Sequence, residues 1–149
     1  MNLSEKILAA AFELREDKPV MVDAVSVSKV QRIENLLDRV DILKLNRLEA
    51  ERLTGITLDT KERVKHAGYQ LVNRGVKRVF ITMGMAGVCA VENKTALFIP
   101  ALPIAVKDVT GAGDAFAAGI ALRLNKDLRA QAESGVTLAA EHLRRKGGV

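Results

Sequence analysis

The sequence predicts an α/β fold in which helices cover a mostly parallel sheet with an antiparallel hairpin at its edge. Short apolar runs typical of buried strands alternate with amphipathic segments typical of helices, as in βαβ units. Two apolar runs, 86–93 and 95–102, follow one another closely, and Asn93-Lys94 between them indicates a hairpin. Hydrophobic residues make up 48% of the 149-residue chain, which is enough for the buried core of one domain.

Helices and strands alternate over the first part of the chain. Amphipathic periodicity predicts helices at 2–17, 28–40 and 47–55. In the first helix, which Asn2 or Ser4 can cap, the residues predicted to face inward are Leu3, Ile7, Leu8, Ala11 and Leu14. In the second they are Val30, Ile33, Leu36 and Leu37, and Gly55 stops the third. The runs 19–25, which Pro19 begins, and 41–46 predict buried strands.

The second part of the chain continues this pattern. A helix is predicted over 59–75, with Asp59 as its cap, Glu62 completing a capping box, and Gly75 at its end. The clearest strand of the sequence, 76–84, follows, and then the two strands of the hairpin. Two further helices are expected over 113–126 and 128–146.

Composition and charge exclude several classes of protein. The net charge of +5 is mild, acidic and basic residues are interspersed, and aromatic residues make up only 3% of the chain. A nucleic-acid module usually combines a basic face with aromatic platforms, so no nucleic-acid partner is expected. No apolar run approaches the roughly 20 residues of a membrane span, and no signal peptide is evident. We therefore expect a soluble, cytoplasmic protein without a membrane partner.

The single cysteine and the two histidines have structural interpretations. Cys89 is the single cysteine of the sequence, so no internal disulfide can form. The surrounding residues GVCAV predict a buried thiol in a strand. His66 and His142 each stand alone on a charged helix, without a second ligand at metal spacing, and are expected to face solvent. Neither histidine therefore predicts a metal site.

The stretch 108–119, DVTGAGDAFAAG, places glycines and a carboxylate at the predicted start of a helix. If the helix begins near Gly113, the amides of residues 111–114 have no intrahelical partners, and glycine lets a ligand approach them closely. The helix dipole adds partial positive charge there, which suits a phosphate or the charge that develops in phosphoryl transfer.

Asp114 lies within this stretch, where a carboxylate would repel an anion rather than bind it. A carboxylate in that place is suited to accept the proton of an attacking hydroxyl group. The alternative interpretation is structural, with Asp114 as an N-cap and the glycines in a turn. The pattern lacks the third glycine of the G-x-G-x-x-G dinucleotide motif, because Phe116 stands in its place.

The stretch 81–87, ITMGMAG, places a hydroxyl group and two glycines just past the clearest strand. Thr82, Gly84 and Gly87 suit contacts with a phosphate or a ribose, since glycine permits close approach of the backbone. The alternative is an ordinary turn at the end of a strand.

The stretch 43–55, LKLNRLEAERLTG, places Asn46 and Glu49 three residues apart where a strand passes into a helix. The structural interpretation is a capping box. The functional interpretation is an amide and a carboxylate that organise magnesium-bound waters around phosphates.

These three stretches, in this order, resemble the carbohydrate-kinase family that includes ribokinase, fructokinase and adenosine kinase, also called the PfkB family. The resemblance covers essentially the whole chain and implies a three-layer α/β/α, ribokinase-like fold and an ATP-dependent kinase. The run 19–55 is most similar to the pseudouridine kinases, with Leu45 in place of their usual proline.

The resemblance also implies roles for individual residues. Asp114 would be the catalytic base, and the amides of Gly111, Ala112, Gly113 and Asp114 would form the anion hole. The residues that would bind ATP are Asn46, Glu49, Thr82, Gly84, Gly87, Val136, Ala139 and Ala140, the last three beside adenine. Glu49 would position Mg²⁺ through water. Asp108 and Thr110 match a loop for a monovalent cation, usually potassium, and 144–148 resembles its other half.

Members of this family are longer than this chain. The resemblance implies that residues 1–149 are the C-terminal, ATP-binding and catalytic portion, without the N-terminal half that carries the acceptor site and lid. We therefore expect the sheet to expose a strand edge and the chain to form a homo-oligomer or to associate with the other half. Kinase activity of the chain alone is expected to be negligible, because nothing positions the acceptor hydroxyl. A non-catalytic nucleotide-binding module is the alternative function.

Overall fold

The computed structural model describes residues 5–147 of the chain. The strands are β1 (Met21–Asp23), β2 (Ile42–Asn46), β3 (Arg78–Thr82), β4 (Val88–Glu92) and β5 (Thr95–Ile99). The α-helices are α1 (Glu5–Glu13), α2 (Val27–Val30), α3 (Arg47–Thr54), α4 (Lys61–Asn73), α5 (Ala112–Ala121) and α6 (Leu128–Lys146). Two 3₁₀ helices, η1 (Gln31–Arg39) and η2 (Gly84–Ala86), complete the elements.

The five strands form one mixed sheet in the order β1-β2-β3-β4-β5. The first three strands are parallel, and β4 and β5 are antiparallel to their neighbours, so the predicted hairpin lies at one edge. Asn93 in its turn has a φ of 50°, a left-handed conformation that asparagine tolerates. The predicted fold class is confirmed.

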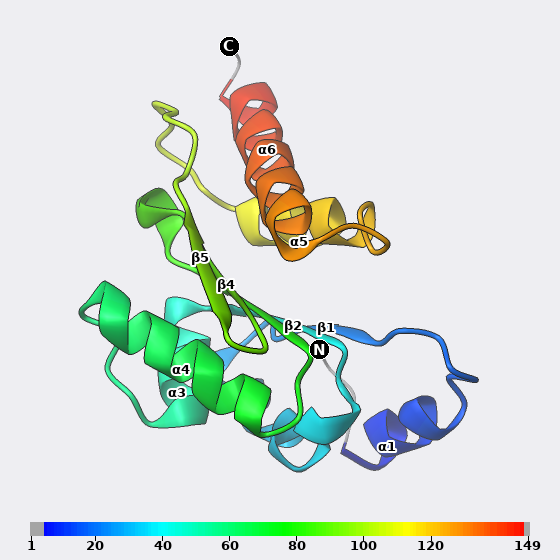
Figure 1. Ribbon diagram of the computed structural model, residues 1–149. Coiled ribbons are helices and arrows are strands. Elements are labelled where there is room, and N and C mark those ends of the chain that lie inside the picture. The colour runs from blue at the N-terminus through cyan, green and yellow to red at the C-terminus, as the bar shows by residue number, and fades with distance from the viewer. Residues whose placement is uncertain (1–4, 148–149) are drawn as a thin grey trace.

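Helices cover both faces of the sheet and make three layers (Figure 1). Alternate residues of a strand point to opposite faces, so Leu43 and Leu45 join the core beneath α3 and α4. Ile42, from the same strand, joins a second core beneath α5 and α6. No helix within residues 5–147 is both long and apolar enough to cross a membrane.

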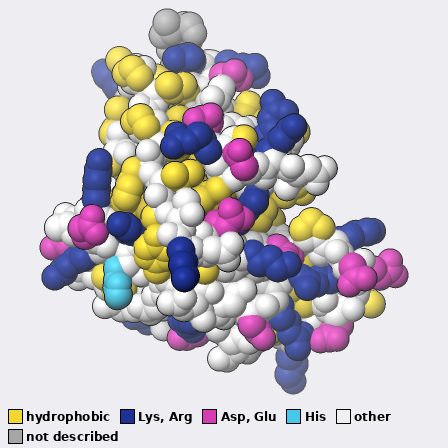
Figure 2. Space-filling view, viewed as in Figure 1, with side chains coloured by type: hydrophobic (Ala, Val, Ile, Leu, Met, Phe, Trp, Pro, Cys, Tyr) yellow, Lys and Arg dark blue, Asp and Glu magenta, His cyan; other side chains and the backbone are white. Residues whose placement is uncertain are grey.

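The surface mixes charges of both signs. Figure 2 shows one face, on which Lys and Arg side chains lie among Asp and Glu side chains. Hydrophobic side chains show between them in the upper part of the view, where α6 and the loop before α5 lie. The distribution on this face follows the interspersed charges of the sequence.

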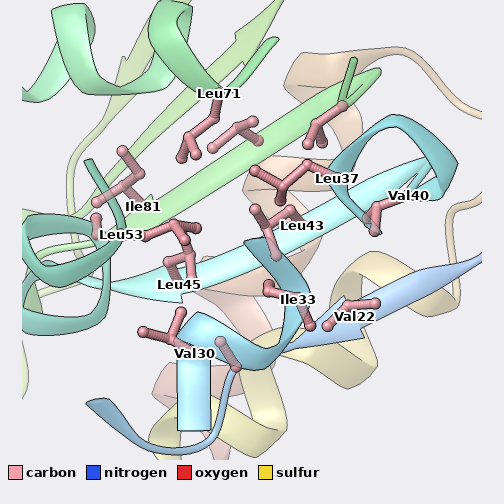
Figure 3. Close-up of a cluster of buried hydrophobic side chains, with 14 of the residues drawn as sticks. Val22, Val30, Ile33, Leu37, Val40, Leu43, Leu45, Leu53, Leu71 and Ile81 are labelled. Carbon is pink, nitrogen blue, oxygen red and sulfur yellow. The ribbon is translucent and has the colours of Figure 1, made fainter. Parts of the chain in front are cut away.

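The larger core lies between β2–β4 and the helices that precede β4 in sequence (Figure 3). Val30, Ile33 and Leu37 from α2 and η1 pack with Leu43 and Leu45 of β2. All the inward positions predicted for segment 28–40 are buried, although most of this segment is 3₁₀ helix rather than the α-helix expected. The apolar spacing therefore predicted the buried face correctly but not the winding of the backbone.

The smaller core fixes α5 and α6 on the other face of the sheet. Phe116 of α5 packs edge-on against Phe80 of β3, with 6.3 Å between the ring centroids. Glycines let the two helices approach closely, since a Cβ on Gly119 would lie 2.5 Å from the Ser134 carbonyl oxygen. The Ser134 hydroxyl donates to the Gly119 carbonyl over 2.8 Å. These contacts determine where α5 begins relative to the sheet.

The inward face predicted for the first helix is wrong. In α1, Ile7, Ala11 and Leu14 were expected inside, but Ile7 is 53% and Leu14 80% exposed and Ala11 is also exposed. Helix α1 packs on η1, and Phe12 is the large side chain that this contact buries. Leu3, the side chain of Leu8, and the predicted caps Asn2 and Ser4 lie outside what the structure describes.

The predicted cap of α4, Asp59 with Glu62 completing a capping box, is also wrong. Thr60 is the N-cap, because its hydroxyl accepts from the Arg63 amide over 3.2 Å. Asp59 instead pairs with the Arg63 guanidinium at 3.5 Å. The helix still ends just before Gly75, which has a positive φ as expected for a terminating glycine.

Candidate functional site

The carboxyl ends of the parallel strands bring the predicted polar residues together. Asn46 ends β2 and Thr82 ends β3, and the two residues are partners in the sheet register. Asp23 ends β1 beside them. Ligands bind at this edge in open α/β sheets, so the strand ends mark a candidate site.

A cavity of about 620 Å³ lies against this edge. It is bounded by the ends of β2 and β3, the turn around η2, the loop before α5, the start of α5, and one face of α6. The predicted site residues that line it are Asn46, Thr82, Gly84, Gly87, Ala112, Gly113, Val136, Ala139 and Ala140. This volume is in the range of small-molecule sites.

The cavity has an apolar wall and a polar end. Val136, Ala139 and Ala140 of α6 make the wall together with Phe116 and Leu143. Lys44, Asn46 and the amides at the start of α5 supply the polar end. The shape and chemistry suit a ligand with a flat apolar group and an anionic group.

Gly111 is the N-cap of α5, with a φ of 87° that favours glycine. The helix begins at Ala112, one residue before the predicted start, and no side chain caps it. Asp114 lies exposed in the first turn, so its interpretation as an N-cap is wrong. The helix start is therefore open to a ligand, as the functional interpretation requires.

Three of the four predicted amides are available at this helix start. The Ala112 amide donates to the Val109 carbonyl over 3.2 Å. The amides of Gly111, Gly113 and Asp114 donate to no group within the described part of the chain. These three amides can donate to an anion. The Ala112 amide can do so only by losing its hydrogen bond to the Val109 carbonyl.

Lys44 is a site residue that the sequence analysis missed. A Cβ on Gly113 would lie 2.9 Å from the Lys44 ammonium, which therefore occupies the space beside the helix start. The Lys44 side chain is 7% exposed, and its ammonium pairs with the Asp23 carboxylate at 3.0 Å. A buried cation beside a positive helix end makes a strong site for an anion. The signal in the sequence was a lysine inside an otherwise apolar strand, where charge is rarely buried without a partner.

Glu49 is 2% exposed and does not line the cavity. Its carboxylate accepts from the Asn46 amide over 2.8 Å, and the Asn46 side chain accepts from the Glu49 amide over 2.9 Å, so the capping box is confirmed. Burial raises the pKa of Glu49, against the hydrogen bond from Asn46 and the charge of Lys44. The carboxylates of Asp23 and Glu49 and the Asn46 amide are the hard oxygen donors near the strand ends, and they fit Mg²⁺ held through water.

Asp108 and Thr110 lie in the loop before α5, but Lys146 already engages their oxygens. One Asp108 oxygen accepts from the Thr110 amide over 2.9 Å, and the other pairs with the Lys146 ammonium at 2.7 Å. The same ammonium donates to the Thr110 carbonyl over 3.3 Å. Hydrogen bonds from Lys146 and Thr110 hold the pKa of Asp108 well below its usual range.

The structure corrects the prediction for one histidine. His142 does not face solvent but is half-buried, with its Nε2 3.1 Å from the Thr110 carbonyl oxygen. His66 is exposed, as predicted. Cys89 is buried in β4, where burial raises the pKa of its thiol to about 12. This thiol is therefore no candidate nucleophile.

Comparisons with known proteins agree with this arrangement. Residues 2–149 match the pfkB family of carbohydrate kinases. The chain is 37% identical over 122 residues to the pseudouridine kinase of Escherichia coli strain K12, covering 80% of this chain and 39% of that protein. It is 28% identical over 142 residues to the ribokinase of Staphylococcus aureus strain COL, covering 85% of this chain and 47% of that protein.

A solved structure shows the same fold. The ribokinase of Arabidopsis thaliana, complexed with ribose and ATP, superposes with a TM-score of 0.84 at 27% sequence identity, covering 96% of this chain and 47% of that chain. This chain thus spans less than half the length of these relatives. Motifs, fold and family match together show that the chain belongs to the pfkB family of carbohydrate kinases.

Proposed function

We propose that residues 1–149 are the ATP-binding and catalytic portion of a kinase that transfers a phosphoryl group from MgATP to a hydroxyl group of a sugar or nucleoside. The observation that carries this proposal is the open start of α5. There Gly113, whose amide is free, lies beside the Lys44 ammonium at one end of the cavity, and the free amide of Asp114 follows in the same helical turn. Donors held in place before the reaction are what phosphoryl transfer needs, because charge develops on the transferred group.

The cavity orients the nucleotide in this proposal. The apolar wall of Val136, Ala139 and Ala140 would hold adenine, and the turn with Gly84 and Gly87 would bring backbone close to the ribose and phosphates. The phosphates would then extend towards Lys44 and the start of α5. The ammonium and the helix dipole attract the same anion and stabilise it together.

Asp114 is the proposed base. As the acceptor oxygen forms its bond to the terminal phosphorus, its proton passes to the Asp114 carboxylate, and the bond from phosphorus to the bridging oxygen breaks to release ADP. Asp114 is exposed in the first turn of α5, so an acceptor can reach it. Its peptide amide lies in the same turn and would donate to the transferred group.

Magnesium would be held at the ends of β1 and β2. Asn46, Glu49 and Asp23 would position it through water, and the bound ion would neutralise phosphate charge. Asp23 has a second role there, because its carboxylate forms an ion pair with the Lys44 ammonium and holds it in position. The two tasks are compatible, since a carboxylate has several lone-pair positions.

Pseudouridine is the acceptor that we propose, because the Escherichia coli relative with 37% identity is a pseudouridine kinase. The residues that bind and select the acceptor are proposed to lie in a further N-terminal half, since this chain spans only 39% of that relative. A cytoplasmic location belongs to the same proposal, because MgATP and nucleosides are cytoplasmic substrates.

The proposal includes association through the sheet edge. β1 ends the strand order, and Val25 and Val27 just beyond it are 60% and 37% exposed. An unpaired parallel strand is a template for another chain. Light scattering is expected to report a dimer or larger species, and a compact monomer at all concentrations would contradict this part of the proposal.

Calorimetric titration with MgATP tests the nucleotide site. The wild-type chain and Asp114→Asn are expected to bind equally, because Asp114 serves proton transfer and not affinity. The double variant Lys44→Met/Asp23→Asn removes the ion pair without stranding one charge, and its affinity is expected to fall roughly tenfold to hundredfold. Glu133→Gln, on the exposed side of α6, is the matched control and is expected to bind like the wild type.

Each result has a definite meaning once circular dichroism shows that the variants fold. Binding by the wild type, with ADP release when pseudouridine or ribose is added, supports a kinase. Binding without turnover is the result expected of the chain alone, because the residues that bind the acceptor are proposed to lie in the further N-terminal half. Binding that still gives no turnover once that half is supplied would support the second candidate, a nucleotide-binding module. Lack of MgATP binding by the wild-type chain would contradict the proposal that this chain holds the ATP site.

A further inference from the structure

The loop between β5 and α5 is contacted by a positively charged side chain, Lys146 of α6. The Lys146 ammonium lies 2.7 Å from Asp108 Oδ2 and donates to the Thr110 carbonyl over 3.3 Å. Lys146 ends α6, so the contact joins the last turn of one helix to the residues just before the start of another. These are the two loop residues whose match to the family suggested a monovalent metal ion.

The arrangement does not fit an added potassium ion. A monovalent metal needs several oxygens directed at one point without a competing cation. Here the Asp108 carboxylate is shared between the Thr110 amide and the Lys146 ammonium. The Thr110 carbonyl also lies 3.1 Å from the His142 ring nitrogen.

The geometry points to Lys146 as the built-in substitute for the monovalent cation of this loop. Its ammonium supplies one positive charge at the Thr110 carbonyl, and the loop therefore requires no potassium. The peptide unit that carries this carbonyl ends in the Gly111 amide, which is one of the free donors at the start of α5. A positive charge on the carbonyl oxygen polarises that amide and strengthens it as a donor to an anion.

The consequence for phosphoryl transfer rests on the proposed function, but the occupancy of the loop does not. It can be tested on the wild-type chain without nucleotide or acceptor. At 149 residues the chain is small enough for amide-resolved NMR spectra, and the Gly111 amide reports directly on the Thr110 carbonyl. Failure of this test would leave the MgATP titration unaffected, so the two can be judged separately.

The experiment is a potassium titration in sodium-free tetramethylammonium buffer at constant ionic strength. In the wild-type chain, the Gly111 amide resonance is expected to stay in place. In Lys146→Gln it is expected to start from a different position and then to move saturably with potassium, because the loop oxygens become available. Arg144→Gln removes the same charge from the same helix turn and is expected to behave like the wild type.

Two results would overturn the inference. A saturable shift at Gly111 in the wild-type chain would show that potassium binds despite Lys146. No response in folded Lys146→Gln would show that the loop is not a cation site and that Lys146 makes only a surface ion pair. If Lys146→Gln does not fold, Lys146→Met removes the charge and keeps the aliphatic packing. The wild-type titration alone still shows whether potassium binds despite Lys146.

Discussion

The Lys44 ammonium lies against Gly113, where a Cβ would come within 2.9 Å of it. The contact joins the middle of β2 to the first turn of α5, two segments far apart in the sequence. It places a buried positive charge at a helix start that is itself partly positive. The Asp23 carboxylate, 3.0 Å from the ammonium, makes this arrangement stable without a bound anion.

Gly113→Ala is expected to weaken MgATP binding without destabilising the fold. The methyl group displaces only the flexible end of the Lys44 side chain, so the ammonium moves away from the free amides. Alanine favours helix over glycine by up to about 1 kcal/mol, so the free energy of unfolding should stay equal or rise. Calorimetry and urea denaturation measure the two effects, and a loss of stability together with full affinity would contradict the prediction.

Gly119→Ala, on the same helix, is expected to do the opposite. Its methyl group would meet the backbone of α6, 2.5 Å from the Ser134 carbonyl oxygen, which cannot move aside as a side chain can. We expect the free energy of unfolding to fall by about 1–3 kcal/mol, as for other overpacked contacts. Urea denaturation provides the measurement, and Gly113→Ala serves as the matched control. An unchanged midpoint would show that α5 can shift on α6.

Glu49→Gln is expected to change how stability depends on pH. Because burial raises the pKa of Glu49 above its ordinary 4.5, the folded chain holds this proton more tightly than the unfolded chain. The contribution of Glu49 to stability is therefore fully present below pH 4.5 and is lost as pH rises through the raised value. Glutamine keeps a capping side chain but does not titrate.

The measurement for Glu49 is urea denaturation over a series of pH values. The free energy of unfolding of the wild type minus that of Glu49→Gln should fall as pH rises from 4.5 and then level off. Glu133→Gln, which removes the exposed partner of Arg129, is the control variant measured over the same pH series. If the difference in free energy of unfolding between the wild type and Glu49→Gln rises with pH, the hydrogen bond from Asn46 and the charge of Lys44 lower the pKa of Glu49 more than burial raises it.

Local patterns predicted most of the fold and part of the site. Alternating apolar and amphipathic segments predicted the order of strands and helices, and the spacing of Asn46 and Glu49 predicted their reciprocal cap. Both depend on interactions between near neighbours in sequence. The inward face of α1 was predicted wrongly, because its burial depends on the contact with η1 rather than on its own periodicity.

The sequence by itself determined the fold class, the family and the residues around which a site could form, since each is encoded in local periodicity and short motifs. Only the tertiary structure decided that Lys44 and Asp23 meet at Gly113, and that Lys146 and His142 meet at Thr110. Each of these contacts joins segments separated by many residues. They meet because parallel strands place their carboxyl ends side by side and because Gly119 lets α5 pack closely on α6.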